Sequence, residues 1–298
     1  MEQISDKNQL LALISLLDEP DEEVFSRIKI RIFSYGAEAI PVLEKTTFET
    51  MDSLIRERAL EIMQDIREDE LSREFRIWME TSSSDLLKGY LLASRIHYPS
   101  LDEGKLVIDI EQMKLDAWLE LNDNLTALEN IKVLNHILYK IKGFESNKVN
   151  PFSPGNFYLN TLLESHQGNA LTLGMLYIII AQKLKIPVYG VNLPQHFILA
   201  YTSGLTTAIP SGEDVLFYID PFNKGNIFTR REIELFIYQL KMKLDPSYFM
   251  PCSNIDIIRR WFKGLIVSYT QQGDQGKMDS IKRILHVLTP KGEDEDIL

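Results

Sequence analysis

The most apolar segment of the chain lies between Leu171 and Ala181, inside 167–184. Its length and hydrophobicity predict one buried helix, entered through a polar turn that begins at Gln167. Three shorter segments rich in β-branched and aromatic residues follow, at 188–193, 196–201 and 215–220. These patterns predict a small antiparallel sheet packed on a central helix, with a connecting loop at 203–214 and a turn at 222–228.

Apolar residues at helical spacing cover most of the remaining chain. Before the central helix, this spacing predicts helices at 8–19, 22–34, 37–45, 53–67, 75–80, 85–98, 107–119, 127–142 and 157–164. After the sheet, it predicts helices at 230–243 and two more across 256–288, broken at Gln272–Asp274. Hydroxyl groups in Thr81–Ser84 are suitable N-caps for the helix that begins near Asp85. Gly143 is expected to be the C-cap of the helix at 127–142. Thr229 and Glu232 are expected to form a capping box at the start of the helix at 230–243.

The alternation of these patterns predicts an α+β fold that is mostly helical. We expect a helical region at 1–80, a core domain at 81–248, a helical hairpin at 249–290 and an acidic tail at 291–298. The fragment Gly36–Leu43 among paired helices resembles a HEAT-type repeat, and an antiparallel helical bundle without repeat ancestry explains the pattern equally well. The hairpin at 256–288 resembles one tetratricopeptide unit, which more often caps a core than binds a peptide.

Composition and charge exclude several classes of function. The chain has 298 residues, a net charge of -11 and a pI near 5.1, so a basic face for nucleic acid is not expected. No apolar run is long enough to span a bilayer, and the first residues lack the features of a signal peptide, which together predict a cytoplasmic protein without membrane contact.

Metal and cofactor chemistry has no sequence signal. Cys252 is the single cysteine, and the five histidines are scattered without the spacing of a metal motif. We therefore expect no metal and no cofactor. His97 and His136 lie beside apolar neighbours, which favours histidines packed at a seam between helices.

Two polar signals stand at the ends of predicted strands. Pro194–Phe197 opens one strand with His196, and Tyr218–Pro221 closes the next with Asp220. A helix N-terminus followed by a histidine strand and an aspartate strand is the layout of a papain- or transglutaminase-type site. In such a site the helix dipole stabilises a cysteine thiolate, the histidine takes its proton and the aspartate orients the imidazole. Here Ala170 stands where that cysteine would be.

Four motifs in this order resemble the SirB-type branch of bacterial transglutaminase-like proteins, over about residues 85–290. They are Phe157–Glu164, His166–Tyr177, Gly190–Phe197 and Ile219–Asn223. The resemblance implies a papain-like core with Gly168, Asn169 and Ala170 at the helix start, and His196 and Asp220 as the remaining dyad. It also implies that the branch often lacks the cysteine, so that Ala170 is a property of the branch.

The chain departs from the pattern of this branch at two places. Gln195 stands where the branch has glycine in a Pro-Gly-His motif, and His166–Gln167 replaces a basic pair. Gln195 therefore adds a side chain where a ligand would approach the backbone. Ser165 and His166 precede the turn and are expected to line the mouth of the site.

No other residue is a good substitute for the thiol. Thr172 points about 200° around the helix from Ala170, since each residue turns about 100°, and Cys252 lies outside the matched motifs. The favoured interpretation is a catalytically inactive module that binds a protein or peptide, with Gly168, Asn169, Gln195 and Asn223 as binding residues. The alternative is an amide or peptide hydrolase in which His196 and Asp220 activate water. A structural component of a larger assembly is a third class, and the sequence leaves partner identity and oligomeric state open.

Overall fold

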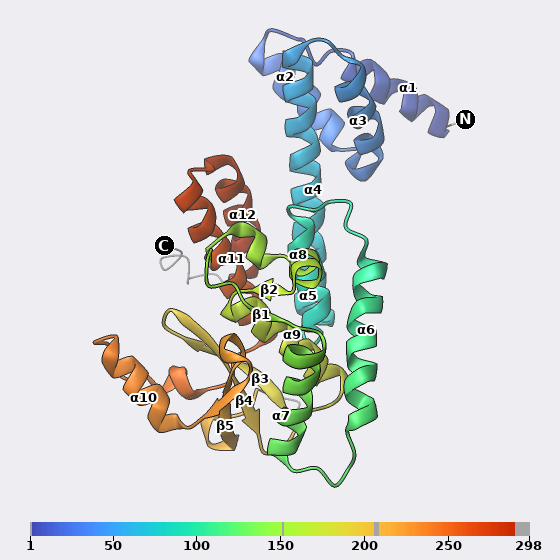
Figure 1. Cartoon of the computed structure of the whole chain (residues 1–298). Coiled ribbons are helices and arrows are strands. Elements are labelled where there is room, and N and C mark those ends of the chain that lie inside the picture. Colours follow the sequence, from blue (N-terminus) through green and yellow to red (C-terminus); the bar gives the residue numbers. More distant parts are fainter. Residues whose placement is uncertain (1, 151, 206–208, 290–298) are drawn as a thin grey trace. The chain divides into compact units, whose positions relative to one another are not determined.

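The computed structural model describes residues 2–150, 152–205 and 209–289 of the chain (Figure 1). It divides into two compact units, Met1–Arg76 and Ile77–Leu298. The division falls inside α4 (Ser53–Thr81), a single helix that joins the separately predicted segments 53–67 and 75–80. The expected acidic tail at 291–298 lies outside the described residues.

The first unit packs its helices around a core of its own. These elements are α1 (Glu2–Ile14), α2 (Glu22–Phe33), the 3₁₀ helix η1 (Gly36–Ala39), α3 (Ile40–Glu49) and the first part of α4. Arg58 of α4 is buried in this core, where its guanidinium donates to Leu17 O at 2.9 Å and Glu19 O at 2.6 Å. The side chain thereby satisfies carbonyl groups of the segment that connects α1 to α2.

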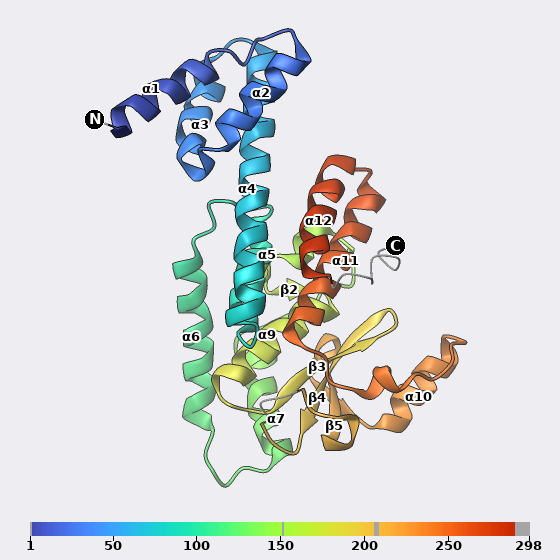
Figure 2. The same cartoon turned by 180° about the vertical axis from the view of Figure 1, so that it is seen from behind.

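The second unit contains eight α-helices within the described ranges: α5 (Leu86–Arg95), α6 (Glu103–Glu120), α7 (Ala127–Asn135), α8 (Leu159–Ser165), α9 (Ala170–Lys183), α10 (Arg230–Gln239), α11 (Asn254–Gln272) and α12 (Gln275–Leu288). Helix α9 is the predicted central helix, and residues 171–181 are all buried. Figure 2 shows α11 and α12 side by side as the predicted C-terminal hairpin. None of the helices in the described ranges has the length and apolar character needed to cross a membrane.

The sheet has four antiparallel strands in the order β3-β4-β5-β6. Strands β3 (Val188–Leu193), β4 (His196–Thr202) and β5 (Val215–Asp220) confirm the predicted ones. The predicted turn at 222–228 is wrong in part, because 226–228 form β6 (Asn226–Phe228), which pairs with β5. A second, parallel pair, β1 (Glu145–Ser146) with β2 (Gln167–Gly168), had no sequence signal because each strand is only two residues long.

Helices cover both faces of the four-stranded sheet (Figure 1). On one face, Phe197 of β4 packs so closely on α9 that a Cβ atom at Gly174 would lie 2.7 Å from its ring. On the other face, Ile198 and Ala200 of β4 share a core with Ile233 and Ile237 of α10. The alternation of side chains along β4 thus joins the two layers, which gives the α+β fold that the sequence predicts.

Several predicted element boundaries were wrong. The cap of α5 is the Asp85 carboxylate, which accepts from Lys88 N at 3.2 Å, instead of a hydroxyl of Thr81–Ser84. The predicted helix 127–142 changes at its end into the π-helix η2 (His136–Ile141). Segment 157–164 divides into the 3₁₀ helix η3 (Pro154–Phe157) and α8, and α10 ends at Gln239. Short 3₁₀ helices complete the unit at η4 (Gly212–Asp214), η5 (Pro221–Asn223) and η6 (Pro246–Phe249).

Candidate functional site

The start of α9 is fixed by a reciprocal cap. Asn169 Oδ1 accepts from Thr172 N at 2.9 Å, and Thr172 Oγ1 accepts from Asn169 N at 3.1 Å. Thr172 is fully buried by this arrangement, so its hydroxyl group serves the cap and is not at the cleft. Gly168 precedes the cap in a crowded position, where a Cβ atom would lie 2.7 Å from Thr172 Oγ1 and 2.8 Å from a methyl carbon of Leu162.

His196 and Asp220 lie side by side at the ends of β4 and β5. His196 Nε2 and Asp220 Oδ1 are 3.2 Å apart, and an ionised carboxylate can only accept, so Nε2 carries the donated hydrogen. Asp220 also accepts from Phe222 N at 3.0 Å and from the Asn223 side chain. Burial opposes ionisation of Asp220, yet these hydrogen bonds outweigh it and lower the pKa of its carboxyl group.

Gln195 occupies the turn between β3 and β4. Its φ of 58° is in the left-handed region, which glycine adopts without steric cost. This conformation explains why a glycine stands here in the pattern that the sequence resembles. The β3–β4 register pairs Leu193 with His196, so Pro194 and Gln195 form the two-residue connection.

The space beside Ala170 and His196 is an open cleft. It has a volume of about 570 Å³. Its lining includes Asn169, Ala170, Leu171, Gln195, His196, Phe197, Phe222, Phe152, Phe157, Arg260, Lys263, Gly264 and Val267. The set contains no serine, threonine, tyrosine or cysteine. Among the residues that the structure describes, the cleft therefore provides an imidazole but no hydroxyl or thiol group to attack a carbonyl carbon.

The remaining predicted site residues have other positions. Asp220 and Asn223 line an adjacent cavity of about 390 Å³, which His196 also lines, so the imidazole stands between the two cavities. Ser165 and His166 do not line the cleft, contrary to expectation. Ser165 Oγ donates to Thr161 O at 2.7 Å, and the His166 ring packs 4.9 Å from that of Phe144.

One wall of the cleft comes from α11 and was missed by the sequence analysis. Its residues 260, 263, 264 and 267 line the cleft with the i, i+3, i+4, i+7 spacing of one helix face. That spacing was a usable signal, although only the fold brings this face to the β3–β4 turn. Arg260 connects the two, donating to Leu193 O at 2.8 Å and His196 O at 2.7 Å.

Cys252 and the other histidines do not belong to the cleft. Burial raises the pKa of the Cys252 thiol to about 12, and Cys252 does not line the cleft. The His97 ring stacks on Tyr158 with centroids 5.2 Å apart, and His136 begins η2. In the part of the chain that the structure describes, no group of three or more His, Cys, Asp or Glu residues could hold a metal ion.

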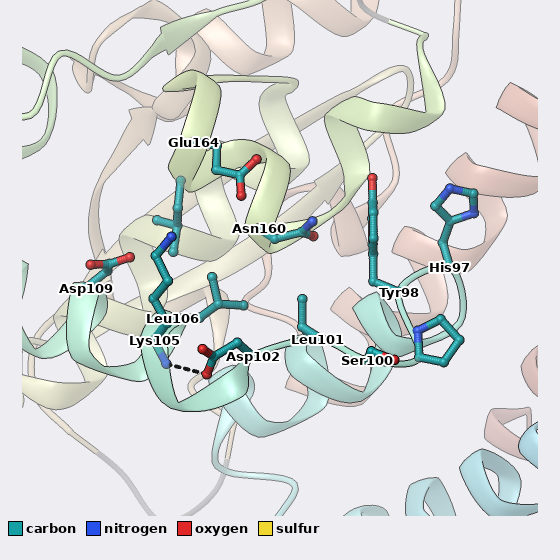
Figure 3. A pocket seen from close by; sticks show the side chains of 12 residues that line it. His97, Tyr98, Ser100, Leu101, Asp102, Lys105, Leu106, Asp109, Asn160 and Glu164 are labelled. Carbon is teal, nitrogen blue, oxygen red and sulfur yellow. Dashed lines mark hydrogen bonds between the residues drawn. The ribbon is translucent and has the colours of Figure 1, made fainter. Parts of the chain in front are cut away.

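Another cavity, of about 580 Å³, lies between α6 and α8 (Figure 3). Asn160 and Glu164 of α8 face Lys105 and Asp109 of α6 across it. Asp102 caps α6 by accepting from Lys105 N at 3.0 Å. No motif connects these residues in the sequence, so nothing predicted this cavity.

The start of a buried helix, a histidine on one strand and its aspartate on the next define the layout of a papain-like or transglutaminase-like core. A family model described as the transglutaminase-like superfamily matches residues 105–263, more than half of the chain. The chain belongs to this superfamily.

Curated relatives match only part of the chain. F-box only protein 21 of Homo sapiens is 32% identical over 109 residues, 37% of this chain and 17% of that protein. A UPF0162 protein of Xylella fastidiosa is 29% identical over half of each chain, and one of Vibrio cholerae is 24% identical over 59% of this chain and 63% of its own. The chain thus spans less than two thirds of the length of each of these relatives. No solved structure matches it at a significant level.

Proposed function

We propose that this protein is a catalytically inactive transglutaminase-like protein whose cleft binds a peptide or a protein segment. The observation that carries the proposal is the open cleft of about 570 Å³ beside Ala170 and His196. An alanine methyl group cannot form the covalent intermediate on which a cysteine mechanism depends. If the protein had lost both its catalytic activity and its ligand binding, we would expect side chains to pack into the cleft, because protein interiors are close-packed.

The shape of the site favours an extended ligand. His196 lines both the cleft and the adjacent cavity of about 390 Å³. A chain that crosses His196 would contact Asn169 and Gln195 on one side and Asn223 on the other. These polar side chains, with Gly168 holding the helix start, are the binding residues that we propose.

We also propose a branch of the superfamily, a division of the chain into regions, and a cellular location. We place the chain in the SirB-type branch, with HEAT-like helices at 1–80, the core at 81–248 and a tetratricopeptide-like hairpin at 249–290. The hairpin contributes α11, which forms one wall of the cleft. We also propose a cytoplasmic location, with a protein or peptide as the partner.

A second candidate function is supported by the His196–Asp220 hydrogen bond. With Nε2–H donated to Asp220, the neutral imidazole has Nδ1 as its acceptor nitrogen. That tautomer is the one a general base needs to take a proton from water. The alternative is therefore an amide or peptide hydrolase that works without a covalent intermediate.

Filling the cleft tests the binding proposal. Ala170→Phe places a phenyl ring in the cleft, and His286→Ala, an exposed change on α12, is the control. We expect the full-length protein to retain peptides from a random library. Ala170→Phe should lose them and His286→Ala should retain them. Equal retention by Ala170→Phe, with unchanged circular dichroism, would contradict the proposal.

A further inference from the structure

The charge on the cleft lining is opposite to that of the whole chain. The chain carries 43 acidic and 32 basic residues, for a net charge of -11. The cleft lining includes Arg260 and Lys263, and none of its described residues is an aspartate or glutamate. The acidic residues nearest to this lining, Asp220 and Glu232, belong to the adjacent cavity on the other side of His196. Within the cleft itself the charged side chains of the described residues are therefore basic, although acidic residues dominate the composition.

Arg260 is a largely buried cation whose hydrogen-bond partners are neutral. Its guanidinium donates to Leu193 O, His196 O and Asn192 Oδ1, at 2.8, 2.7 and 3.3 Å. Its neighbour Arg259 differs, since it pairs with Asp256 at 2.9 Å. Burial lowers the pKa of Arg260. Among the described residues, the hydrogen bonds of this guanidinium go to neutral partners and to no carboxylate, so an incoming carboxylate gains from it.

The start of α9 adds positive potential to the same cleft. The reciprocal cap uses the N–H groups of Asn169 and Thr172. The N–H groups of Ala170 and Leu171 lie in the first turn, where a helix offers no internal acceptor. Both residues line the cleft. The positive end of the α9 dipole therefore adds to the positive potential that Arg260 and Lys263 produce in the cleft.

Apolar side chains make up most of the remaining lining. Four phenylalanines contribute to it, together with Leu171 and Val267: Phe152, Phe157, Phe197 and Phe222. A small inorganic anion would leave the exposed side chains of Phe152 and Val267 in water. A ligand that combines carboxylates with large apolar side chains would use both parts of the lining.

We propose that the cleft binds an acidic peptide segment in which aspartate or glutamate residues alternate with large apolar residues. This inference rests on the proposed peptide-binding function and names the chemistry of its partner. The carboxylates face Arg260, Lys263 and the start of α9, and the apolar side chains pack on the phenylalanines. The excess of acidic residues elsewhere on the chain would repel such a peptide from other surfaces.

Fluorescence anisotropy with paired peptides tests the inference on the full-length protein. The probe is labelled Phe-Glu-Leu-Asp-Phe, and its uncharged counterpart is Phe-Gln-Leu-Asn-Phe. We expect the acidic peptide to bind roughly tenfold more tightly at low salt, the effect of one charge-assisted hydrogen bond. The preference should decrease as salt screens the charges.

The variant Lys263→Gln identifies the cleft as the source of the preference. Lys263 is exposed and lines the cleft, and Lys277→Gln removes one exposed charge from α12 outside it. Lys263→Gln should weaken binding of the acidic peptide severalfold and should weaken binding of the uncharged peptide much less. Lys277→Gln should change neither.

The possible failures are distinguishable. Equal affinity for the two peptides, both lost in Ala170→Phe, would overturn the acidic preference and leave peptide binding intact. No binding of either peptide, together with no retention of random peptides, would reject the proposed function itself. Binding of laurate with no binding of the acidic peptide would replace the peptide by a fatty acid and overturn the inference.

Discussion

Ala170, His196 and Asp220 show which part of the site a sequence can predict. Each belongs to a short motif at the boundary of a strongly patterned element, so their order along the chain implied that they lie close together. Arg260 and Lys263 could not be assigned in this way. They come from a helix in the C-terminal hairpin, and only packing brings that helix to the β3–β4 turn.

The Asp220 carboxylate should contribute pH-dependent stability. Its pKa is lowered in the folded chain, against about 3.9 for an unfolded aspartate. Its contribution is then fully present above about pH 4 and is lost as the pH falls through the folded value. We expect Asp220→Asn to be less stable than the wild type at pH 6, and the difference to shrink toward pH 2.

Urea titrations at several pH values measure this difference. Asn223→Ala removes one hydrogen bond to Asp220 and keeps the carboxylate. It should therefore show a weaker pH dependence of the same sign relative to the wild type. A stability difference for Asp220→Asn that stays constant between pH 6 and pH 2 would be inconsistent with a lowered pKa.

Cys252 should be unreactive in the folded chain. With a thiol pKa of about 12, roughly one molecule in ten thousand carries a thiolate at pH 8, and the thiolate is the reactive form. We expect a thiol-reactive disulfide to label the native protein slowly and the urea-unfolded protein rapidly. Ala170→Cys, with a second thiol in the cleft, should label rapidly when native. Rapid labelling of native wild type would refute the assignment of Cys252 as a buried thiol.

At the scale of elements, long patterned segments were predictable and short ones were not. The central helix, three strands and the C-terminal hairpin follow from apolar periodicity over many residues. Strands β1, β2 and β6 have only two or three residues each, too few to produce a period. The cap of α5 depended on whether Asp85 or a hydroxyl group of Thr81–Ser84 reaches the free N–H groups, and both residue types are common caps.

Because α9 lies so close to the sheet, we expect Gly174 to tolerate no larger side chain. Gly174→Ala would place a methyl group 2.7 Å from the Phe197 ring, which we expect to cost about 1–3 kcal/mol of unfolding free energy. Gly276→Ala on α12 is the matched control, because a Cβ atom there meets nothing within 4 Å. It should be neutral or stabilise by up to about 1 kcal/mol.

Tryptophan fluorescence during urea unfolding measures both changes. Trp78, Trp118 and Trp261, the three tryptophans of the chain, all belong to the unit Ile77–Leu298. The signal therefore reports the unit in which both glycines lie. A Gly174→Ala midpoint equal to that of the wild type would mean that the helix and sheet separate more easily than their packing indicates.

At the scale of the whole molecule, the order of four motifs was enough to predict the superfamily and the α+β core. The division of the chain was harder to predict, because α4 runs through residues 53–81 without a break in its helical pattern. The compact units separate at Arg76, inside that helix. Our four proposed regions follow the sequence pattern, whereas the two units reflect packing.

The central claim is that the cleft recognises a ligand without transforming it. The most direct measurement is turnover of a panel of peptide, amide and ester substrates by wild type, His196→Ala and His286→Ala. Our account predicts that all three proteins match the buffer background, because the cleft provides no nucleophile at Ala170. Turnover by wild type and by His286→Ala that disappears in His196→Ala would contradict the claim and establish the water-activating hydrolase.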